Sequence, residues 1–173
     1  MSATASRPAP SESGAYYHRY IAHVPDGDIL DTLGRQLDDT AELLAGVEDG
    51  SMRYAPDKWT VRQVLIHMID TERVFAYRAL RFARGDETPL PGYDQDEFMQ
   101  TTDVSERSIA SLLDEFRSVR ASTLSLLRGL DDAAWDRAGV ASGHPMTTRG
   151  AVWVIAGHER HHAAVLRDRY LAA

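Results

Sequence analysis

Apolar side chains recur every three or four positions over four long stretches of the chain, a spacing typical of amphipathic α-helices. Each stretch begins near a residue that can cap a helix and ends near a glycine or the C-terminus. The expected helices run from residue 26 or 28 to about 50, from 60 to 84, from 103–105 to about 129, and from 147 or 148 almost to the C-terminus. Four helices of this length pack naturally as a bundle.

The second helix has the clearest start. In Thr60-Val61-Arg62-Gln63, the Thr hydroxyl and the Gln side chain form a capping box, each satisfying a backbone amide of the other residue. No convincing alternating strand is found. Residues 85–98, rich in proline and glycine, are expected to form a crossover loop, residues 131–135 a short helical turn, and residues 139–145 a loop. The predicted fold class is therefore all-α, a four-helix bundle with a long crossover.

The domain organisation is simple, since 173 residues suit one domain. Pro8, Pro10 and Gly14 disfavour regular structure, so residues 1–22 are expected to form a weakly ordered N-terminal lead-in, from which three tyrosines could dock onto the bundle. Residues 23–173 form the single predicted bundle domain. The net charge of −7 argues against nucleic acid as a partner, and no stretch is apolar enough to cross a membrane or act as a secretory signal. We expect a soluble, cytoplasmic protein.

The chain contains no cysteine and seven histidines. A transition metal would therefore be held by imidazole and carboxylate. His158 and His162 are four residues apart, on one face of the last helix, and His67 lies within the apolar stripe of the second. Two imidazoles so spaced can share an ion. The alternatives are a hydrogen-bonded core histidine and a solvated surface pair.

The segment His158-Glu159-Arg160-His161-His162 also matches H-E-x-x-H, in which the glutamate of a metalloprotease serves as general base. The extended motif would require Gly and His where this chain has Val165 and Asp168, and too few residues follow for a downstream ligand. A third ligand must come from upstream, and His67 is the best candidate. A di-iron carboxylate site is disfavoured because a second E-x-x-H is absent.

The chain resembles the DinB-like superfamily of four-helix bundle metalloproteins from about residue 26 to 170. The resemblance lies in Trp59-Thr60 followed by His67, in the segment Leu90–Asp96, and in the closing segment His158–His162. It implies a metal site at His67, His158 and His162, a long crossover and a homodimer. It also implies nickel, zinc or iron as the divalent metal, without choosing among them.

Other polar residues lie near the predicted ligands in the sequence. Asp70 could be a fourth ligand, an acceptor for an imidazole N–H or a surface carboxylate, and for Glu72 a surface position is favoured. His161 is expected to point away from the metal, toward residues that support the ligands or toward solvent. Tyr93 and Asp94 could fold over the site, or Asp94 could cap a turn.

Three uncharged ligands leave the charge of the ion uncompensated and favour an anion, hydroxide or thiolate, in the next position. The resemblance implies a metal-dependent S-transferase that uses a low-molecular-weight thiol and a small-molecule electrophile. The alternatives are a metal-dependent hydrolase using metal-bound hydroxide and a non-enzymatic, stress-associated metal-binding bundle. No catalytic residue beyond the ligands is predicted, and any reactive sulfur must come from outside the chain.

Overall fold

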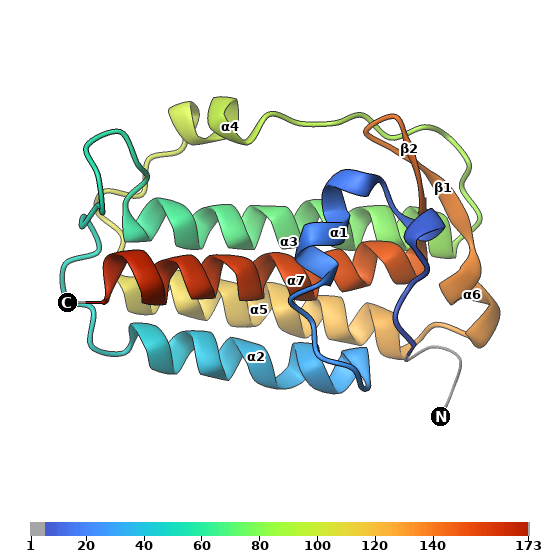
Figure 1. Ribbon diagram of the computed structural model, residues 1–173, viewed down its shortest axis with the longest axis horizontal. Helices are drawn as coiled ribbons and strands as arrows, with labels where there is room; N and C mark the ends of the chain where they lie inside the picture. The colour runs from blue at the N-terminus through green and yellow to red at the C-terminus, as the bar shows by residue number, and fades with distance from the viewer. Residues whose placement is uncertain (1–5, 173) are drawn as a thin grey trace.

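The computed structural model describes residues 6–172 and confirms the predicted fold class. Four long helices pack side by side as a bundle (Figure 1). Their bounds are α2 Ile29–Leu44, α3 Val61–Ala83, α5 Ile109–Arg128 and α7 Thr148–Val165. Among the helices of the described residues, none is long and apolar enough to cross a lipid bilayer.

Side-chain caps fix where these helices begin. Asp28 caps α2, and Thr60 and Gln63 form the predicted capping box of α3. Thr147 caps α7 by accepting from the amide of Gly150. The third helix starts later than predicted, because the Ser108 hydroxyl, and not a residue at 103–105, accepts from the first turn of α5.

The order of the helices in space differs from their order in the chain. α3 packs against α5 and α7, and α2 packs against the same two helices, so α2 and α3 lie diagonally. α3 and α5 run in one direction, and α2 and α7 run in the other (Figure 1). Because two parallel helices follow each other, the chain must return along the full length of the bundle between them. Residues 84–108 make this crossover.

Short elements complete the fold, and some of them correct the sequence predictions. The crossover contains α4, Gln95–Thr101, where residues up to 98 were predicted to be loop. Residues 139–145 lie within an antiparallel hairpin of β1, Ala138–Ala141, and β2, His144–Thr147. Ser142 and Gly143 in its turn both have positive φ. Because serine rarely adopts this conformation, the sequence did not indicate a hairpin turn here. α6, Asp132–Asp136, agrees with the predicted turn, and a π-helix, Leu166–Tyr170, continues α7.

The N-terminal segment has more regular structure than the sequence suggested. Residues 1–5 of the predicted lead-in lie outside the described residues. Three short helices follow, namely η2 Pro10–Glu12, η3 Ala15–Tyr17 and α1 His18–Ile21. α1 packs on α7 and buries the side chains of Tyr20 and Ile21. This docking brings Tyr20 close to the middle of the bundle.

The core is divided by a polar layer. One apolar cluster includes Leu33, Phe75, Leu127 and Ile155, and a second includes Leu37, Leu65, Phe116 and Leu166. Between them, at the middle of each long helix, lie buried polar side chains, namely Gln36, Thr40, His67, Thr71, Glu72, Arg120, Thr123, His158 and Glu159. Buried polar groups require hydrogen-bond or ion-pair partners. The partners within this polar layer therefore define the candidate functional site.

The contact between α1 and α7 depends on Gly157. A Cβ at this position would come 2.1 Å from the carbonyl oxygen of Tyr20. Gly157→Ala should therefore displace α1 and lower the free energy of unfolding by ~1–3 kcal/mol. Gly34→Ala, on α2 with open space around it, is the matched control and should be stabilising by ~0.5–1 kcal/mol. Urea unfolding followed by circular dichroism measures both; equal effects of the two substitutions would contradict this packing.

Candidate metal centre

Three histidines from two antiparallel helices meet in the polar layer. His67 comes from the first half of α3, and His158 and His162 come from the second half of α7. The side chains of His67 and His158 are buried, at 4% and 5% exposed, and His162 lies one turn further along α7. Helical spacing places His158 and His162 on the face of α7 that packs against α3.

The three imidazoles point their nitrogens at a common point. The Nε2 atoms of His67 and His158 are 3.0 Å apart, and those of His162 and His158 are 3.1 Å apart. All three candidate ligand atoms lie within 4.8 Å of one another. The His158 Nε2 atom has one proton or one lone pair, so it cannot form a hydrogen bond with both neighbouring Nε2 atoms at once. Tetrahedral coordination at a metal–nitrogen distance of ~2.0–2.1 Å would place ligand nitrogens ~3.3 Å apart. The two distances from the His158 Nε2 atom are close to this value.

Burial keeps these histidines neutral. It lowers the pKa of His67 to about 4. The pKa values of His158 and His162 are well below the usual range, first because of burial and then because of neighbouring histidines. A neutral imidazole has the free lone pair that a metal ion requires. The donor set therefore fits a divalent transition metal such as nickel, zinc or iron.

Aromatic side chains pack against two of the three histidines. The Trp59 ring lies 4.9 Å from that of His67, and the Tyr20 ring lies 5.3 Å from that of His158. Burial raises the pKa of Tyr20 to about 12, so its hydroxyl stays protonated at neutral pH. Sequence reasoning missed Tyr20 as a site residue, because nothing in the lead-in indicates where it docks.

The remaining predicted site residues lie around this centre. The His161 ring contacts the rings of Tyr20 and His23, on the side where α1 docks. Asp70 pairs with Arg73, which also pairs with Glu115 of α5. In the described part of the chain no hydrogen bond joins Asp70 to an imidazole. Its carboxylate instead pairs with Arg73 of the same helix, and Arg73 connects it to α5.

Glu72 is not the surface carboxylate that the sequence favoured. It is 2% exposed, and both of its oxygens accept hydrogen bonds from Arg120 of α5 at 2.7–3.2 Å. Arg120 also donates to Glu159 of α7 at 2.7 Å and to the carbonyl oxygen of Leu33 of α2 at 2.6 Å. The two carboxylates raise the pKa of Arg120 above its usual range, against the opposing effect of burial. One guanidinium thus links all four long helices.

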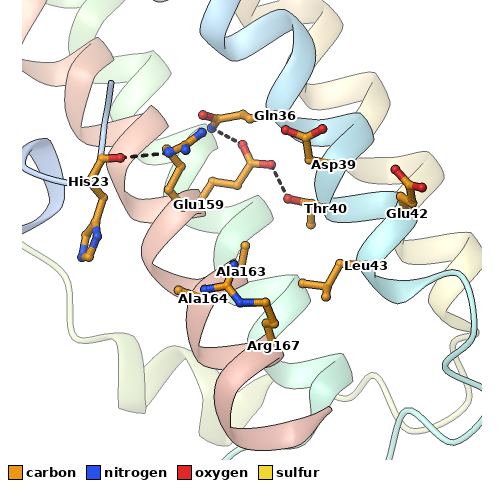
Figure 2. A pocket seen from close by; sticks show the side chains of 11 residues that line it. His23, Gln36, Asp39, Thr40, Glu42, Leu43, Glu159, Ala163, Ala164 and Arg167 are labelled. Carbon is orange, nitrogen blue, oxygen red and sulfur yellow. Dashed lines mark hydrogen bonds between the residues drawn. The ribbon is translucent and has the colours of Figure 1, made fainter. Parts of the chain in front are cut away.

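The glutamate of the H-E-x-x-H match has a structural position. Figure 2 shows the Glu159 side chain directed at α2, where Thr40 donates to one oxygen at 2.8 Å and Gln36 donates to the other. With Arg120 added, both oxygens are occupied. The carboxylate lies on the α2 side of α7 and not among the imidazoles, so the arrangement of a metalloprotease with Glu159 as general base is absent from the described residues.

Two cavities reach the histidine cluster, one lined by His158 and the other by His162. The tyrosine cavity, of about 400 Å³, is lined by Tyr16, Tyr20 and Tyr93 together with His158. The tryptophan cavity, of about 530 Å³, is lined by Trp59, Tyr170 and other residues together with His162. Gln95 and Asp96, in the first turn of α4, line both cavities. A third cavity, of about 500 Å³, lies between α2 and α7 and is not lined by any of the three histidines (Figure 2).

The crossover holds α4 beside the two cavities. The Tyr93 and Thr71 hydroxyls lie 3.1 Å apart and share a hydrogen bond, which ties the loop to α3. Asp94 caps α4 by accepting from the amides of Asp96 and Glu97 at 2.8 and 3.1 Å. The sequence offered two roles for this segment, covering the site and capping a turn. Tyr93 lines a cavity beside the histidines, and Asp94 caps a helix.

Comparison with known proteins identifies the class. A model of the DinB superfamily matches residues 32–166, which include all three histidines, and the chain therefore belongs to this superfamily. No curated protein matches the chain. Among solved structures, YfiT from Bacillus subtilis is similar with a TM-score of 0.70 and 22% identity, covering 95% of this chain and 91% of YfiT. YfiT is described as a probable metal-dependent hydrolase with an unusual four-helix bundle topology. At this identity the likeness shows the fold.

The low pKa of His67 predicts acid sensitivity of the metal-free protein. The folded chain resists protonation of His67 down to about pH 4, whereas the unfolded chain takes up this proton near 6.5. The stability contributed by the neutral ring is present above about pH 6.5 and lost as pH falls through about 4, at up to about 1.4 kcal/mol per pH unit. His67→Gln should make the unfolding free energy fall less steeply over this range in urea titrations. An unchanged slope would contradict the burial described.

The central arginine predicts coupling between stability and metal binding. Arg120→Met leaves two buried carboxylates without a cation, which should cost about 3–5 kcal/mol of unfolding free energy. It should also weaken metal binding at least tenfold, because Arg120 links α3 to α7. Arg117→Met, on the exposed face of α5, is the control and should change stability by less than ~0.5 kcal/mol.

Denaturant unfolding and competition with a chromophoric chelator measure the two effects. If Arg120→Met does not fold, Arg120→Lys keeps the charge and should give intermediate values. Wild-type metal affinity in a folded Arg120 variant would show that the link does not position the histidines.

Proposed function

We propose that this protein is a divalent-metal-dependent enzyme in which His67, His158 and His162 hold the ion. The convergence of three neutral Nε2 atoms, on the buried His67 and His158 and the half-buried His162, carries this proposal. A divalent ion there would supply Lewis acidity and lower the pKa of a coordinated small nucleophile. No carboxylate belongs to the donor cluster found among the described residues, so the ligands do not offset the charge of the ion.

The reaction we propose is S-transfer from a low-molecular-weight thiol to a small electrophile. The thiol sulfur bonds to the electrophilic carbon, the leaving group departs with its electron pair, and the thiol proton passes to solvent. The observation that favours this reaction is the pair of cavities, one lined by His158 and one lined by His162, which would let two molecules approach one centre. Since the chain has no cysteine, the thiol is a substrate.

The protein's own residues would prepare this centre. Trp59 and Tyr20 pack against the rings of His67 and His158 and hold them in place. The protonated Tyr20 hydroxyl offers a hydrogen-bond donor beside the tyrosine cavity, and Arg19 donates to its oxygen at 2.9 Å. The Glu72–Arg120–Glu159 cluster holds the spacing of α3 and α7.

Hydrolysis is the second candidate. It is supported by the description of YfiT, whose fold this chain shares, as a probable metal-dependent hydrolase. The same three imidazoles would serve it, with water taking the place of the thiol. The two reactions differ in whether turnover depends on an added thiol, and this difference is experimentally accessible.

The metal site is tested by measuring metal content and affinity. Wild-type protein should bind one equivalent of Ni²⁺, Zn²⁺ or Co²⁺, and His67→Ala, His158→Ala and His162→Ala should each lower the affinity at least tenfold. His144→Ala, on the exposed edge of the hairpin, is the matched control and should bind as wild type. Equal affinity in wild type and all three variants would refute the site.

The reaction is tested with metal-loaded protein. Conjugation of 1-chloro-2,4-dinitrobenzene should require both the metal and a thiol from a panel of small thiols, and should be lost in His67→Ala. Thiol-independent hydrolysis of nitrophenyl esters would instead support the second candidate. Tight metal binding without turnover across thiols, electrophiles and esters would contradict both and favour a non-enzymatic metal-binding bundle.

A further inference from the structure

Arg78 differs from the other buried arginines. Three arginines are buried in the described part of the chain. Arg120 pairs with two glutamates, and Arg149 pairs with Glu12 and Asp136. Arg78 is 2% exposed, and within residues 6–172 no carboxylate lies within ion-pair distance of it. A buried charge normally requires a partner of opposite sign, so this exception needs an explanation.

The hydrogen bonds of Arg78 leave its guanidinium incompletely used. Nη2 donates to the carbonyl oxygen of Pro91 at 3.1 Å and to the Ser142 hydroxyl at 2.9 Å. Nη1 is buried and has no hydrogen-bond partner. The guanidinium lies over the Phe75 ring, 4.7 Å from its centroid, and 6.0 Å from that of Tyr93. All these partners are uncharged, and one donor group remains free.

The surroundings of Arg78 connect it to the proposed metal centre. Phe75, Tyr93 and Ser142, which contact its guanidinium, also line the tyrosine cavity, and so does His158. Arg78 itself lines an adjoining, mainly apolar cavity of about 350 Å³ that shares Gly92 and Tyr93 with the tyrosine cavity. The cavity that Arg78 lines therefore shares a wall, Gly92 and Tyr93, with the cavity that reaches His158.

We propose that Arg78 binds the anionic group of a small ligand, a carboxylate carried on an aromatic or otherwise apolar body. The carboxylate would enter the cavity that Arg78 lines, accept hydrogen bonds from its guanidinium and supply the negative charge that the nearby side chains do not provide. The mainly apolar lining of that cavity, which includes Tyr77, Leu90 and Tyr93, suits the apolar body. Calling this ligand the electrophilic substrate rests on the proposed function; its binding to Arg78 does not require the metal.

A purely structural role is the competing explanation. By binding Pro91 and Ser142, Arg78 joins the crossover to the tip of the hairpin, and this could be its whole contribution. The two explanations differ in one respect. Only a recognition role predicts that the native, metal-free protein discriminates a carboxylate from a neutral molecule of the same shape.

Benzoate and benzamide make this comparison. Calorimetric titration of metal-free wild-type protein should show benzoate binding at least tenfold more tightly than benzamide. Arg78→Met should lose this preference, Arg78→Lys should retain part of it, and Arg128→Met, an exposed arginine on α5, should leave it unchanged. Circular dichroism establishes that each variant is folded.

The wild-type comparison stands even if Arg78→Met does not fold. No preference for benzoate in wild type, or an undiminished preference in folded Arg78→Met, would overturn the proposal. Because the titrations use metal-free protein, a failure here leaves the metal site untouched. Conversely, benzoate selectivity in a protein that binds no metal would sustain the anion site and refute the proposed enzyme.

Discussion

The salt-bridged cluster of Arg120, Glu72 and Glu159 is the interaction on which the centre of this bundle depends. It lies where the apolar core is interrupted, and its guanidinium also donates to the backbone of α2. A buried ion pair gives little net stability compared with apolar packing, but removing one partner is severely destabilising. Its value here is geometric. It fixes α3 against α7, the two helices that supply the three histidines.

The same polar layer explains how the fold brings together the three histidines of the candidate metal centre. α3 and α7 are antiparallel neighbours because the crossover returns the chain along the bundle between α3 and α5 (Figure 1). Depressed pKa values keep the imidazoles ready to bind an ion, and the ligands carry no charge. Two cavities reach this cluster, one lined by His158 and one by His162, and Phe75, Tyr93 and Ser142 of the first also contact the unpaired Arg78.

Much of the bundle could be predicted from the sequence because local signals define it. The apolar period gave four helices, and the caps at Thr60 and Thr147 lie where the sequence places them. The hairpin turn at Ser142-Gly143 and the short helix α4 carry weaker local signals and were missed. The spacing of His158 and His162, with His67 in an apolar stripe, identified the three residues that the structure brings together.

The rest of the site depends on contacts between distant segments. Glu72 and Arg120 each lie at a position of the apolar stripe of their helix, which indicates that their side chains are buried. Only the packing of α5 on α3 makes them partners. The position of Tyr20 depends on docking of α1 beside Gly157. Neither contact can be predicted from the residues next to it in the sequence.

The central claim is that three imidazoles, from α3 and α7, bind one divalent ion together. X-ray absorption spectroscopy of protein loaded with one equivalent of Zn²⁺ or Ni²⁺ tests it most directly. A three-histidine centre should give multiple-scattering features of three imidazoles at ~2.0–2.1 Å, with the remaining coordination by light atoms from solvent. A first shell with one imidazole or none, or one dominated by carboxylate oxygens, would contradict it.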